Sequence, residues 1–243
     1  MKENRETKEK KEKIPLSFEY ELCSFEKGFI VCGTDEAGRG PLAGPVYAAA
    51  VILDTQNTDS ELLAELDDSK KLTEKKREAL EEKIKKNALS YCVAFSRVDE
   101  IEQTDILSAS LHAMRKAIDG LSLDRNTPKD KLLQNDIEEI GGCTLKPDAV
   151  IVDGNQTRGF KIPAKAIVGG DGKSYSIAAS SILAKVARDR YCYEVMDKEF
   201  PEYSFSKHKG YGTKLHYGAV DKYGLCIHHR RSFFKKYYEA KQI

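Results

Sequence analysis

The chain has 243 residues, of which 40% are apolar and 33% are charged, and its formal net charge is +1. These values indicate a globular protein that buries a sizeable core, and they exclude a surface dominated by one sign of charge. No apolar run approaches the length of a membrane span, and the start, rich in Lys and Glu, differs from a secretory signal. The six cysteines form no C-x-x-C pair, which favours a reducing compartment. We therefore expect a cytoplasmic protein without a membrane segment.

The first part of the chain alternates charged stretches with short apolar runs. Residues 1–15 are predicted to form a charged, disordered tail. The apolar runs predict three strands, at residues 29–35, 47–53 and 91–95. Apolar residues at helical spacing predict two helices, at residues 73–87 and 106–121.

The second part of the chain changes from strands to helices. Residues 123–147 are polar, and we expect a surface insertion of irregular structure there. Strands are predicted at residues 149–154 and 166–168, a long helix at 177–200, and short helices beyond it. This order predicts an α/β fold in which a mixed sheet is flanked by helices and followed by a C-terminal helical extension.

Three aspartates, Asp35, Asp153 and Asp171, share one context, because each follows an apolar run and has a glycine within two positions. Ligand sites of α/β sheets gather at strand ends, where several carboxylates can converge. Oxygen ligands of this kind suit a hard cation such as Mg²⁺, and without a cation such a cluster repels itself. Each aspartate alone could instead cap a turn or a helix. The three together, with the adjacent Glu36, favour a metal site.

Two glycines flank a single arginine in Gly38-Arg39-Gly40. Glycines let backbone N–H groups approach a phosphate or a sugar hydroxyl closely. A plain loop joining two strands is the alternative. Ser69 and Lys70 likewise either contact a phosphate or belong to the start of a capped helix.

The C-terminal part of the chain is basic, since residues 207–243 contain nine Lys and Arg residues against two acidic residues, and four of the five histidines. A basic region beside acidic motifs fits a polyanion bound at a metal site, although a solvated charged face is the alternative. Ser181, Lys185 and Arg188 share one polar stripe of the predicted long helix. That stripe faces either solvent or the site.

The segment from residue 207 to residue 213, KHKGYGT, places Tyr211 between glycines and close to Lys209. A tyrosine exposed in this way suits stacking on a sugar or a base, and a core tyrosine at a turn is the alternative. His228 and His229 have no spaced partner, so we expect them at the surface or facing phosphate and not as metal ligands.

Six short blocks occur in an order that is specific to one known family. They are GTDEAGRGPLAGPVYAAAVIL, DDSKKLTEKKRE, VIVDGN, GGDGKSYSIAASSILAKVARDR, HKGYGT and HRRSF. On these blocks the chain resembles ribonuclease HII, the type 2 ribonuclease H, along most of its length. The resemblance implies a ribonuclease H-like catalytic domain at residues 16–200 and a basic, substrate-binding helical extension at residues 201–243.

The resemblance also implies the chemistry. It implies an endonuclease of ribonucleotide excision repair that cuts 5′ of a ribonucleotide, in RNA–DNA hybrids and in duplex DNA with embedded ribonucleotides. Two ions of Mg²⁺ or Mn²⁺ are expected, and the products are a 3′-hydroxyl and a 5′-phosphate. The implied catalytic metal ligands are Asp35, Glu36, Asp153 and Asp171. The expected substrate contacts are Gly38, Arg39, Gly40, Ser69, Lys70, Ser181, Lys185, Lys209 and Tyr211.

Within these contacts, the Gly-Arg-Gly segment is expected to recognise the 2′-hydroxyl at an RNA–DNA junction, where Tyr211 stacks. Three departures from the family pattern stand out. Gly169 replaces a lysine, which puts one phosphate contact in doubt, Ser180 replaces an alanine, and the polar segment after Leu121 is longer than usual. Ribonuclease HIII is similar in fold but carries a lysine in place of Arg39 and a sizeable N-terminal domain. We expect a monomer, although the sequence carries no signal either way.

Two other classes of protein fit part of the sequence. One is a catalytically silent nucleic-acid-binding module of the same fold, which the presence of all four carboxylates disfavours. The other is a nuclease that acts on DNA alone. It would cut an all-DNA duplex as fast as a duplex that contains one ribonucleotide.

Overall fold

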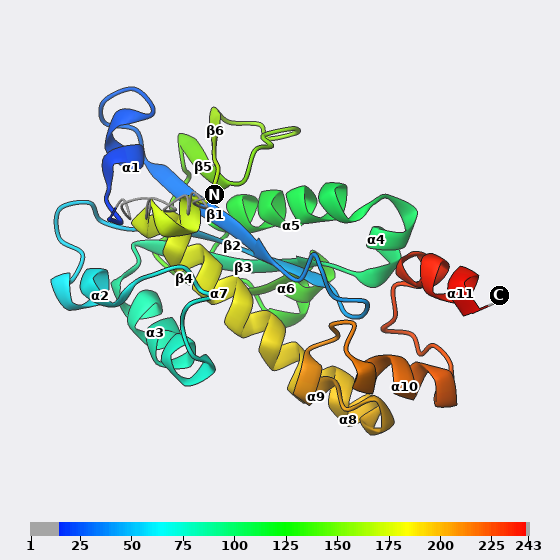
Figure 1. The fold of residues 1–243 in the computed structure, drawn as a ribbon. Coiled ribbons are helices and arrows are strands. Elements are labelled where there is room, and N and C mark those ends of the chain that lie inside the picture. Colours follow the sequence, from blue (N-terminus) through cyan, green and yellow to red (C-terminus); the bar gives the residue numbers. More distant parts are fainter. Residues whose placement is uncertain (1–14, 242–243) are drawn as a thin grey trace, which may run out of the picture.

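The computed structural model describes residues 15–241, so the predicted tail lies almost wholly outside the described residues. Six strands form one mixed sheet in the order β4-β3-β2-β1-β5-β6 (Figure 1). The strands β1 to β4 pair in antiparallel fashion, whereas β5 runs parallel to β1 and β6 parallel to β5. The strands are β1 (Val31–Ala37), β2 (Val46–Ile52), β3 (Ser90–Ser96), β4 (Ile137–Gly142), β5 (Ala149–Asp153) and β6 (Ala164–Ile167).

Helices cover both faces of this sheet. The helices α7 (Tyr175–Tyr191) and α3 (Glu74–Asn87) lie on one face, and α5 (Ile106–Gly120) lies on the other. The predicted α/β architecture with a mixed sheet and flanking helices is therefore confirmed. The remaining helices are α1 (Glu19–Cys23), α2 (Ser60–Glu65), α4 (Val98–Gln103), α6 (Lys129–Gln134), α8 (Asp197–Glu199), α9 (Phe205–His208), α10 (Lys214–Tyr223) and α11 (Lys235–Lys241).

Strand β2 shows why the central sheet residues are so uniformly apolar. Successive side chains of a strand point to opposite faces, and a strand covered on both faces buries both sets. All seven residues of β2 are buried. The α7 side receives Tyr47, Ala49 and Val51, and the α5 side receives Ala48, Ala50 and Ile52.

A close contact fixes α7 against β1. A Cβ on Gly33 would lie 2.4 Å from the backbone carbon of Ser176, so only glycine permits this approach. The hydroxyl of Ser180 lies 2.8 Å from the carbonyl oxygen of Gly33. The serine that replaces the family's usual alanine thus ties α7 to the strand that carries Asp35.

The prediction of an irregular insertion at residues 123–147 is wrong. This segment contains α6 and β4, and β4 pairs with β3 as one edge of the sheet. An edge strand needs few apolar residues because part of it faces solvent. Ile137 is buried, whereas Glu138 and Glu139 are only half-buried. The alternation of apolar and polar residues in β4 is too short and too polar to predict a strand from the sequence.

The long helix also differs from the prediction of residues 177–200. It begins at Tyr175, because the Ser174 hydroxyl accepts a hydrogen bond from the backbone N–H of Ile177. After Tyr191 it continues as a π-helical turn, Cys192–Met196, and then as α8. By contrast, α3 begins where predicted, with Thr73 as its N-cap.

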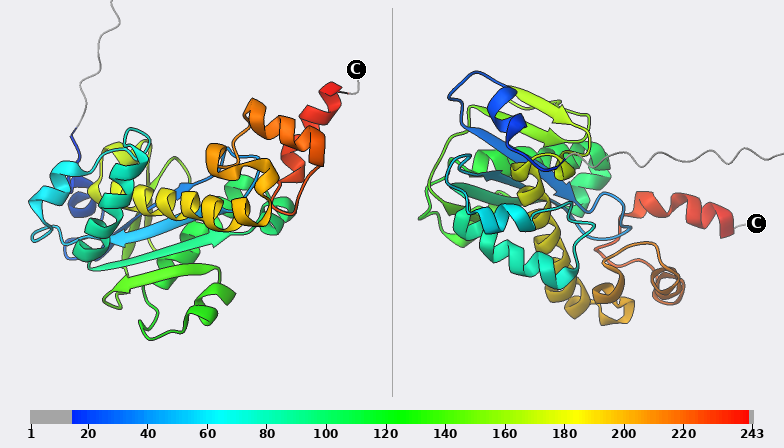
Figure 2. Two further views of the ribbon diagram at one scale, coloured as in Figure 1. Left: turned by 90° about the horizontal axis from the view of Figure 1, so that it is seen from below. Right: turned by 60° about the vertical axis from the view of Figure 1, so that its left-hand side comes forward.

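The C-terminal helices gather at one end of the sheet, beyond the end of α7 (Figure 2). They bury their own apolar cluster, to which the loop between β1 and β2 contributes Leu42 and Ala43. The predicted C-terminal helical region is therefore present, and it rests on the loop that follows the first two acidic residues. None of the helices in the described part of the chain has both the length and the apolarity needed to cross a membrane.

Candidate metal centre and nucleic-acid interface

Three carboxylates converge at the C-terminal ends of the parallel strands. Asp35 lies near the end of β1, Asp153 ends β5, and Asp171 lies in a single 3-10 turn between β6 and α7. One carboxylate oxygen from each lies within 4.8 Å of the other two. The topology thus brings together side chains from positions 35, 153 and 171, as strand ends of an α/β sheet do.

The cluster is electrostatically unfavourable without a cation. Burial raises the pKa of Asp35 well above its ordinary value, and the charges of Glu36 and Asp153 raise it further. Burial likewise raises the pKa of Asp171, with a contribution from the charge of Asp153. Three carboxylates that repel one another across a short distance are the donor set that a divalent cation neutralises. The residues present therefore fit a divalent metal ion.

Backbone geometry holds these carboxylates in place. The Gly170 amide donates to Asp153 Oδ1 across 2.6 Å, and the Glu36 amide donates to Asp35 Oδ1 across 2.7 Å. Gly169 adopts a left-handed backbone with φ of +65°, a conformation that costs little for glycine. The glycine at position 169 therefore suits the turn that presents Asp171.

Glu36 lies beside the cluster and is paired with an arginine. Its carboxylate still interacts with Asp35, because the charge of Glu36 adds to the effect of burial in raising the pKa of Asp35. Its Oε1 pairs with Arg39 Nη1 across 3.3 Å. Burial raises the pKa of Glu36, Arg39 lowers it in part, and the charge of Asp153 raises it further. The predicted role of Glu36 as a fourth ligand stays a prediction.

Lys70 forms an ion pair with one member of the cluster. Its Nζ lies 3.5 Å from Asp171 Oδ2, and its side chain is 79% exposed. The neighbouring Ser69 is buried, and its hydroxyl lies 2.8 Å from that of Ser181, which also bonds to Asp35. In the structure, these two serines therefore support Asp35. Their predicted contact with substrate is untested, as is that of Lys70.

The Gly38-Arg39-Gly40 segment lies beside Tyr211, as a nucleic-acid interface requires. A Cβ on Gly40 would lie 3.5 Å from the Tyr211 ring, and the tyrosine is 45% exposed. The amides of Arg39 and Gly40 have no hydrogen-bond partner within residues 15–241. Two free donors and an exposed ring thus occupy one surface next to the carboxylates.

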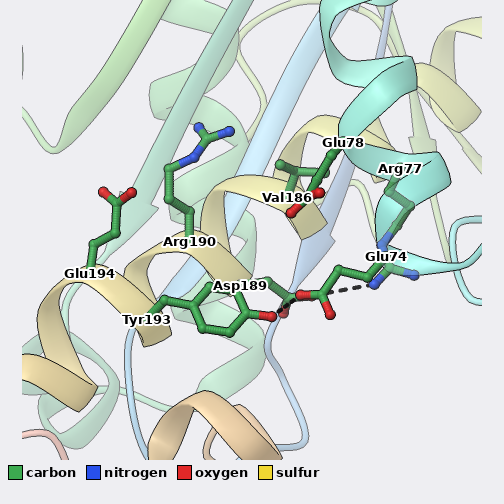
Figure 3. Close-up of a pocket in the computed structure, with 8 residues that line it drawn as sticks. All are labelled: Glu74, Arg77, Glu78, Val186, Asp189, Arg190, Tyr193 and Glu194. Carbon is green, nitrogen blue, oxygen red and sulfur yellow. Dashed lines mark hydrogen bonds and ion pairs between the residues drawn. The ribbon is translucent and has the colours of Figure 1, made fainter.

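Other predicted contacts lie on the side of α7 that faces α3. Lys185 Nζ pairs with Asp189 Oδ1 across 2.6 Å, and Lys209 Nζ lies 3.6 Å from the centre of the Tyr193 ring. A cavity of about 130 Å³ lies here, between α3 and α7. Figure 3 draws the residues that line it, among them the ion pair of Arg77 with Asp189.

The predicted surface positions of His228 and His229 are wrong. Both are buried. His228 Nε2 lies 2.8 Å from Glu199 Oε2, and His229 Nε2 lies 3.0 Å from His216 Nε2. Aromatic residues of the C-terminal cluster, Phe205 among them, pack around these rings. The sequence alone cannot show that these histidines are buried, because the residues that cover them come from several short helices.

Two buried arginines lie under the β1–β2 loop. Arg188, predicted to face either solvent or the site, is buried, and its Nη2 donates to the carbonyls of Ala43 and Lys209. Arg230, which the sequence does not single out, is buried as well. The sequence did contain a hint that both arginines matter, because both lie in the blocks that resemble the ribonuclease HII family. Nothing local distinguishes Arg230 from the exposed Arg231 beside it.

Comparison with solved structures shows the fold. The fold matches the crystal structure of ribonuclease H2 from Pyrococcus horikoshii with a TM-score of 0.57 and 24% identity, covering 83% of this chain and 92% of that one. The ribonuclease HII of Archaeoglobus fulgidus, solved in complex with PCNA, gives the same TM-score at 22% identity, covering 83% and 93%. The fold is therefore that of a type 2 ribonuclease H.

Sequence comparison gives the family. The family model for ribonuclease HII matches residues 32–237. The ribonuclease HII of Idiomarina loihiensis is 48% identical over 204 residues, covering 84% of this chain and 95% of that protein. That of Caldicellulosiruptor bescii is 44% identical over 219 residues, covering 90% and 93%. The chain belongs to the ribonuclease HII family and is a ribonuclease H enzyme. The family depends on divalent metal and acts on RNA–DNA hybrids, and the buried acidic cluster of this chain fits a metal ion.

Proposed function

We propose that the chain is an endonuclease that hydrolyses the phosphodiester on the 5′ side of a ribonucleotide. Its substrates are RNA–DNA hybrids and duplex DNA with embedded ribonucleotides, and its products carry a 3′-hydroxyl and a 5′-phosphate. One observation supports this proposal above all. The three converging carboxylates lie next to a loop with two unpaired amides and an exposed tyrosine.

The carboxylates are the proposed metal ligands. Asp35, Glu36, Asp153 and Asp171 would hold two divalent cations, either Mg²⁺ or Mn²⁺. When bound, such ions stabilise the leaving 3′-oxygen and activate the attacking water. The protein's own part is to keep Asp35 buried and oriented, through the Glu36 amide and the Ser181 hydroxyl.

Specificity is proposed to come from the sugar. The 2′-hydroxyl is what lets a protein distinguish RNA from DNA at one position. The amides of Arg39 and Gly40 are free to donate to it, and the exposed ring and hydroxyl of Tyr211 lie beside them. A ribonucleotide held there would have its 5′ phosphodiester presented to the carboxylates.

Phosphates are proposed to be bound by lysines around this surface. Lys70, Lys207 and Lys214 are exposed, and Lys209 is partly exposed. Binding should therefore weaken steeply as salt rises, since released counterions drive association. We further propose that residues 16–200 catalyse, that residues 201–243 bind substrate, and that the protein acts in the cytoplasm as a monomer.

The decisive experiment is cleavage of a duplex that contains one ribonucleotide, with Mg²⁺, Mn²⁺ and chelator compared and the cut site mapped. We expect one cut, 5′ of the ribonucleotide, that chelator abolishes. An otherwise identical all-DNA duplex is the control. Cleavage of that control at the same rate, or cleavage that survives chelation, contradicts the proposal.

A further inference from the structure

Two buried arginines lie beneath the loop from Gly38 to Gly44, here called the 38–44 loop. Arg188 is 1% exposed and Arg230 is 0% exposed. Neither forms a salt bridge with any carboxylate in residues 15–241. Burial lowers the pKa of Arg230 to about 9, helped by the charge of Arg188, so Arg230 is still protonated at pH 7. Burying a charge is costly unless hydrogen bonds compensate it.

The compensation for Arg230 comes from backbone carbonyls of the 38–44 loop. Its Nη2 donates to Gly38 across 2.7 Å, and its Nε donates to Gly44 across 2.9 Å. Its Nη1 donates to the carbonyls of Arg39 and Pro41, at 3.1 and 2.9 Å. The backbone N–H of Arg230 also donates to Leu42, across 2.9 Å. One residue of the C-terminal region therefore binds five carbonyls of this loop.

Arg188 adds a weaker link from α7. Its Nη2 donates to the carbonyls of Ala43 and Lys209, at 3.1 and 3.0 Å, which joins the 38–44 loop to the segment carrying Tyr211. Its Nε and Nη1 are buried without partners among the described residues. A Cβ on Gly38 would lie 2.1 Å from Arg188 Nε. The glycine at position 38 therefore also makes room for this guanidinium.

The orientation of these carbonyls determines where the loop amides point. A peptide unit is planar and trans, so its C=O and N–H point in opposite directions. The carbonyls of Gly38 and Arg39 point inward to Arg230, so the next amides, those of Arg39 and Gly40, point away from it. Arg39 and Gly40 are exposed, and neither of their amides has a partner among the described residues.

We infer that Arg230, assisted by Arg188, is a positioning residue that holds the 38–44 loop with its amides directed at the substrate 2′-hydroxyl. This inference rests on the proposed function of that loop. It makes recognition of the ribonucleotide depend on a side chain that never touches the nucleic acid. It also explains why the loop packs against the C-terminal cluster, through Leu42 and Ala43.

The test compares Arg230→Lys with Arg231→Lys. Both variants keep the positive charge, but a lysine amine cannot replace the planar fork that binds several carbonyls at once. Arg231 is exposed and serves as the matched control. For each protein, kcat and KM are measured on a duplex with one ribonucleotide and on a long RNA–DNA hybrid. Backbone amide exchange is followed in the 38–44 loop.

We expect Arg230→Lys to lower kcat/KM on the single-ribonucleotide duplex by about 10-fold to 100-fold, since small misplacements are costly. The loss on the long hybrid should be several-fold smaller, because every position there offers a 2′-hydroxyl. The amides of Leu42 and Gly44, bonded to Gly210 and His228, should exchange faster. Mn²⁺ binding to the carboxylate cluster should be unchanged. Arg231→Lys should behave as wild type.

Unchanged amide exchange in Arg230→Lys, or equal losses on both substrates, overturns the inference. The same loss in Arg231→Lys overturns it as well. If Arg230→Lys does not fold, Arg188→Lys is tested in its place. We expect the same changes in kcat/KM and in amide exchange, but smaller ones. Wild-type values of both in Arg188→Lys would refute the positioning role. If the wild-type enzyme ignores a single ribonucleotide, the proposed function fails, whereas amide exchange still decides whether Arg230 positions the loop.

Discussion

The hydroxyls of Ser69 and Ser181 lie 2.8 Å apart, and Ser181 also bonds to Asp35. This contact joins the loop before α3 to α7 directly beside the carboxylate cluster. The two serines are 112 residues apart in the chain. Both are buried, so the pair orients Asp35 from within the protein.

Ser181→Ala should therefore lower cleavage by about 10-fold to 100-fold, the usual cost of removing a group that orients a metal ligand. Ser180→Ala is the matched control on the same helix. Its hydroxyl bonds to Gly33 and Ser176 and not to Asp35, so it should cost about 1 kcal/mol of stability and leave cleavage unchanged. Initial rates and urea unfolding of both variants check this. Equal rates for the two variants would refute it.

Asp35→Asn should reduce cleavage to the level seen with chelator while the protein still binds an RNA–DNA hybrid. Asparagine keeps the size of the side chain but removes the charge that the metal ion needs. Asp130→Asn, an exposed change on α6, is the control and should be fully active. Gel-shift and cleavage assays measure both properties. Full activity in Asp35→Asn would disprove the metal assignment.

Adding Mg²⁺ to metal-free protein should raise its melting temperature. The cation relieves repulsion among Asp35, Asp153 and Asp171, and a ligand at 100 times its Kd stabilises the folded state by about 2.7 kcal/mol. In Asp171→Asn the metal-free protein should melt higher than wild type and gain less from Mg²⁺. Scanning calorimetry with and without chelator measures this. An equal gain in both proteins would place the ion elsewhere.

Tyr211→Ala should weaken transition-state binding on a single-ribonucleotide duplex by about 1–3 kcal/mol, the usual value for a stacked base. Tyr211→Phe keeps the ring and should lose only the contribution of the hydroxyl. Tyr223→Ala, an exposed tyrosine on α10, is the control. The ratio of kcat/KM values gives the result. Wild-type rates in Tyr211→Ala would rule out stacking.

Stability should fall as the pH is lowered from about 6.5 to about 4, because two buried histidines must gain protons. Burial lowers the pKa of His216 to about 4, and burial with the charge of His216 does the same for His229. The unfolded chain binds protons near the ordinary value of 6.5, so in this window the unfolded state binds more protons. For the two histidines together the loss should be on the order of 5 kcal/mol, since each pKa unit corresponds to about 1.36 kcal/mol.

Urea unfolding at pH 7.5 and pH 4.5 measures this loss. His216→Asn should be less stable at neutral pH but should show a smaller drop between the two values. His112→Asn changes a half-exposed histidine outside the C-terminal cluster and should keep the wild-type drop. An identical drop in all three proteins would remove the buried histidines as its cause.

Much of the fold and of the site was predictable from the sequence. Local periodicity located β1, β2, β3, β5, α3 and α5, because central strands and amphipathic helices have apolar patterns that survive without tertiary information. The context of an apolar run followed by a glycine located Asp35, Asp153 and Asp171, which the structure brings together. β4 escaped prediction, since a short edge strand with acidic residues has no such pattern.

By itself, then, the sequence determined the central elements, the acidic set and the family. Only the tertiary structure decided which charged residues are buried and what they contact. Arg230 and Gly38 are 192 residues apart, and neighbouring Arg231 has the same side chain in the opposite environment. Burial of a charge depends on long-range packing, and local residue patterns carry no information on that packing.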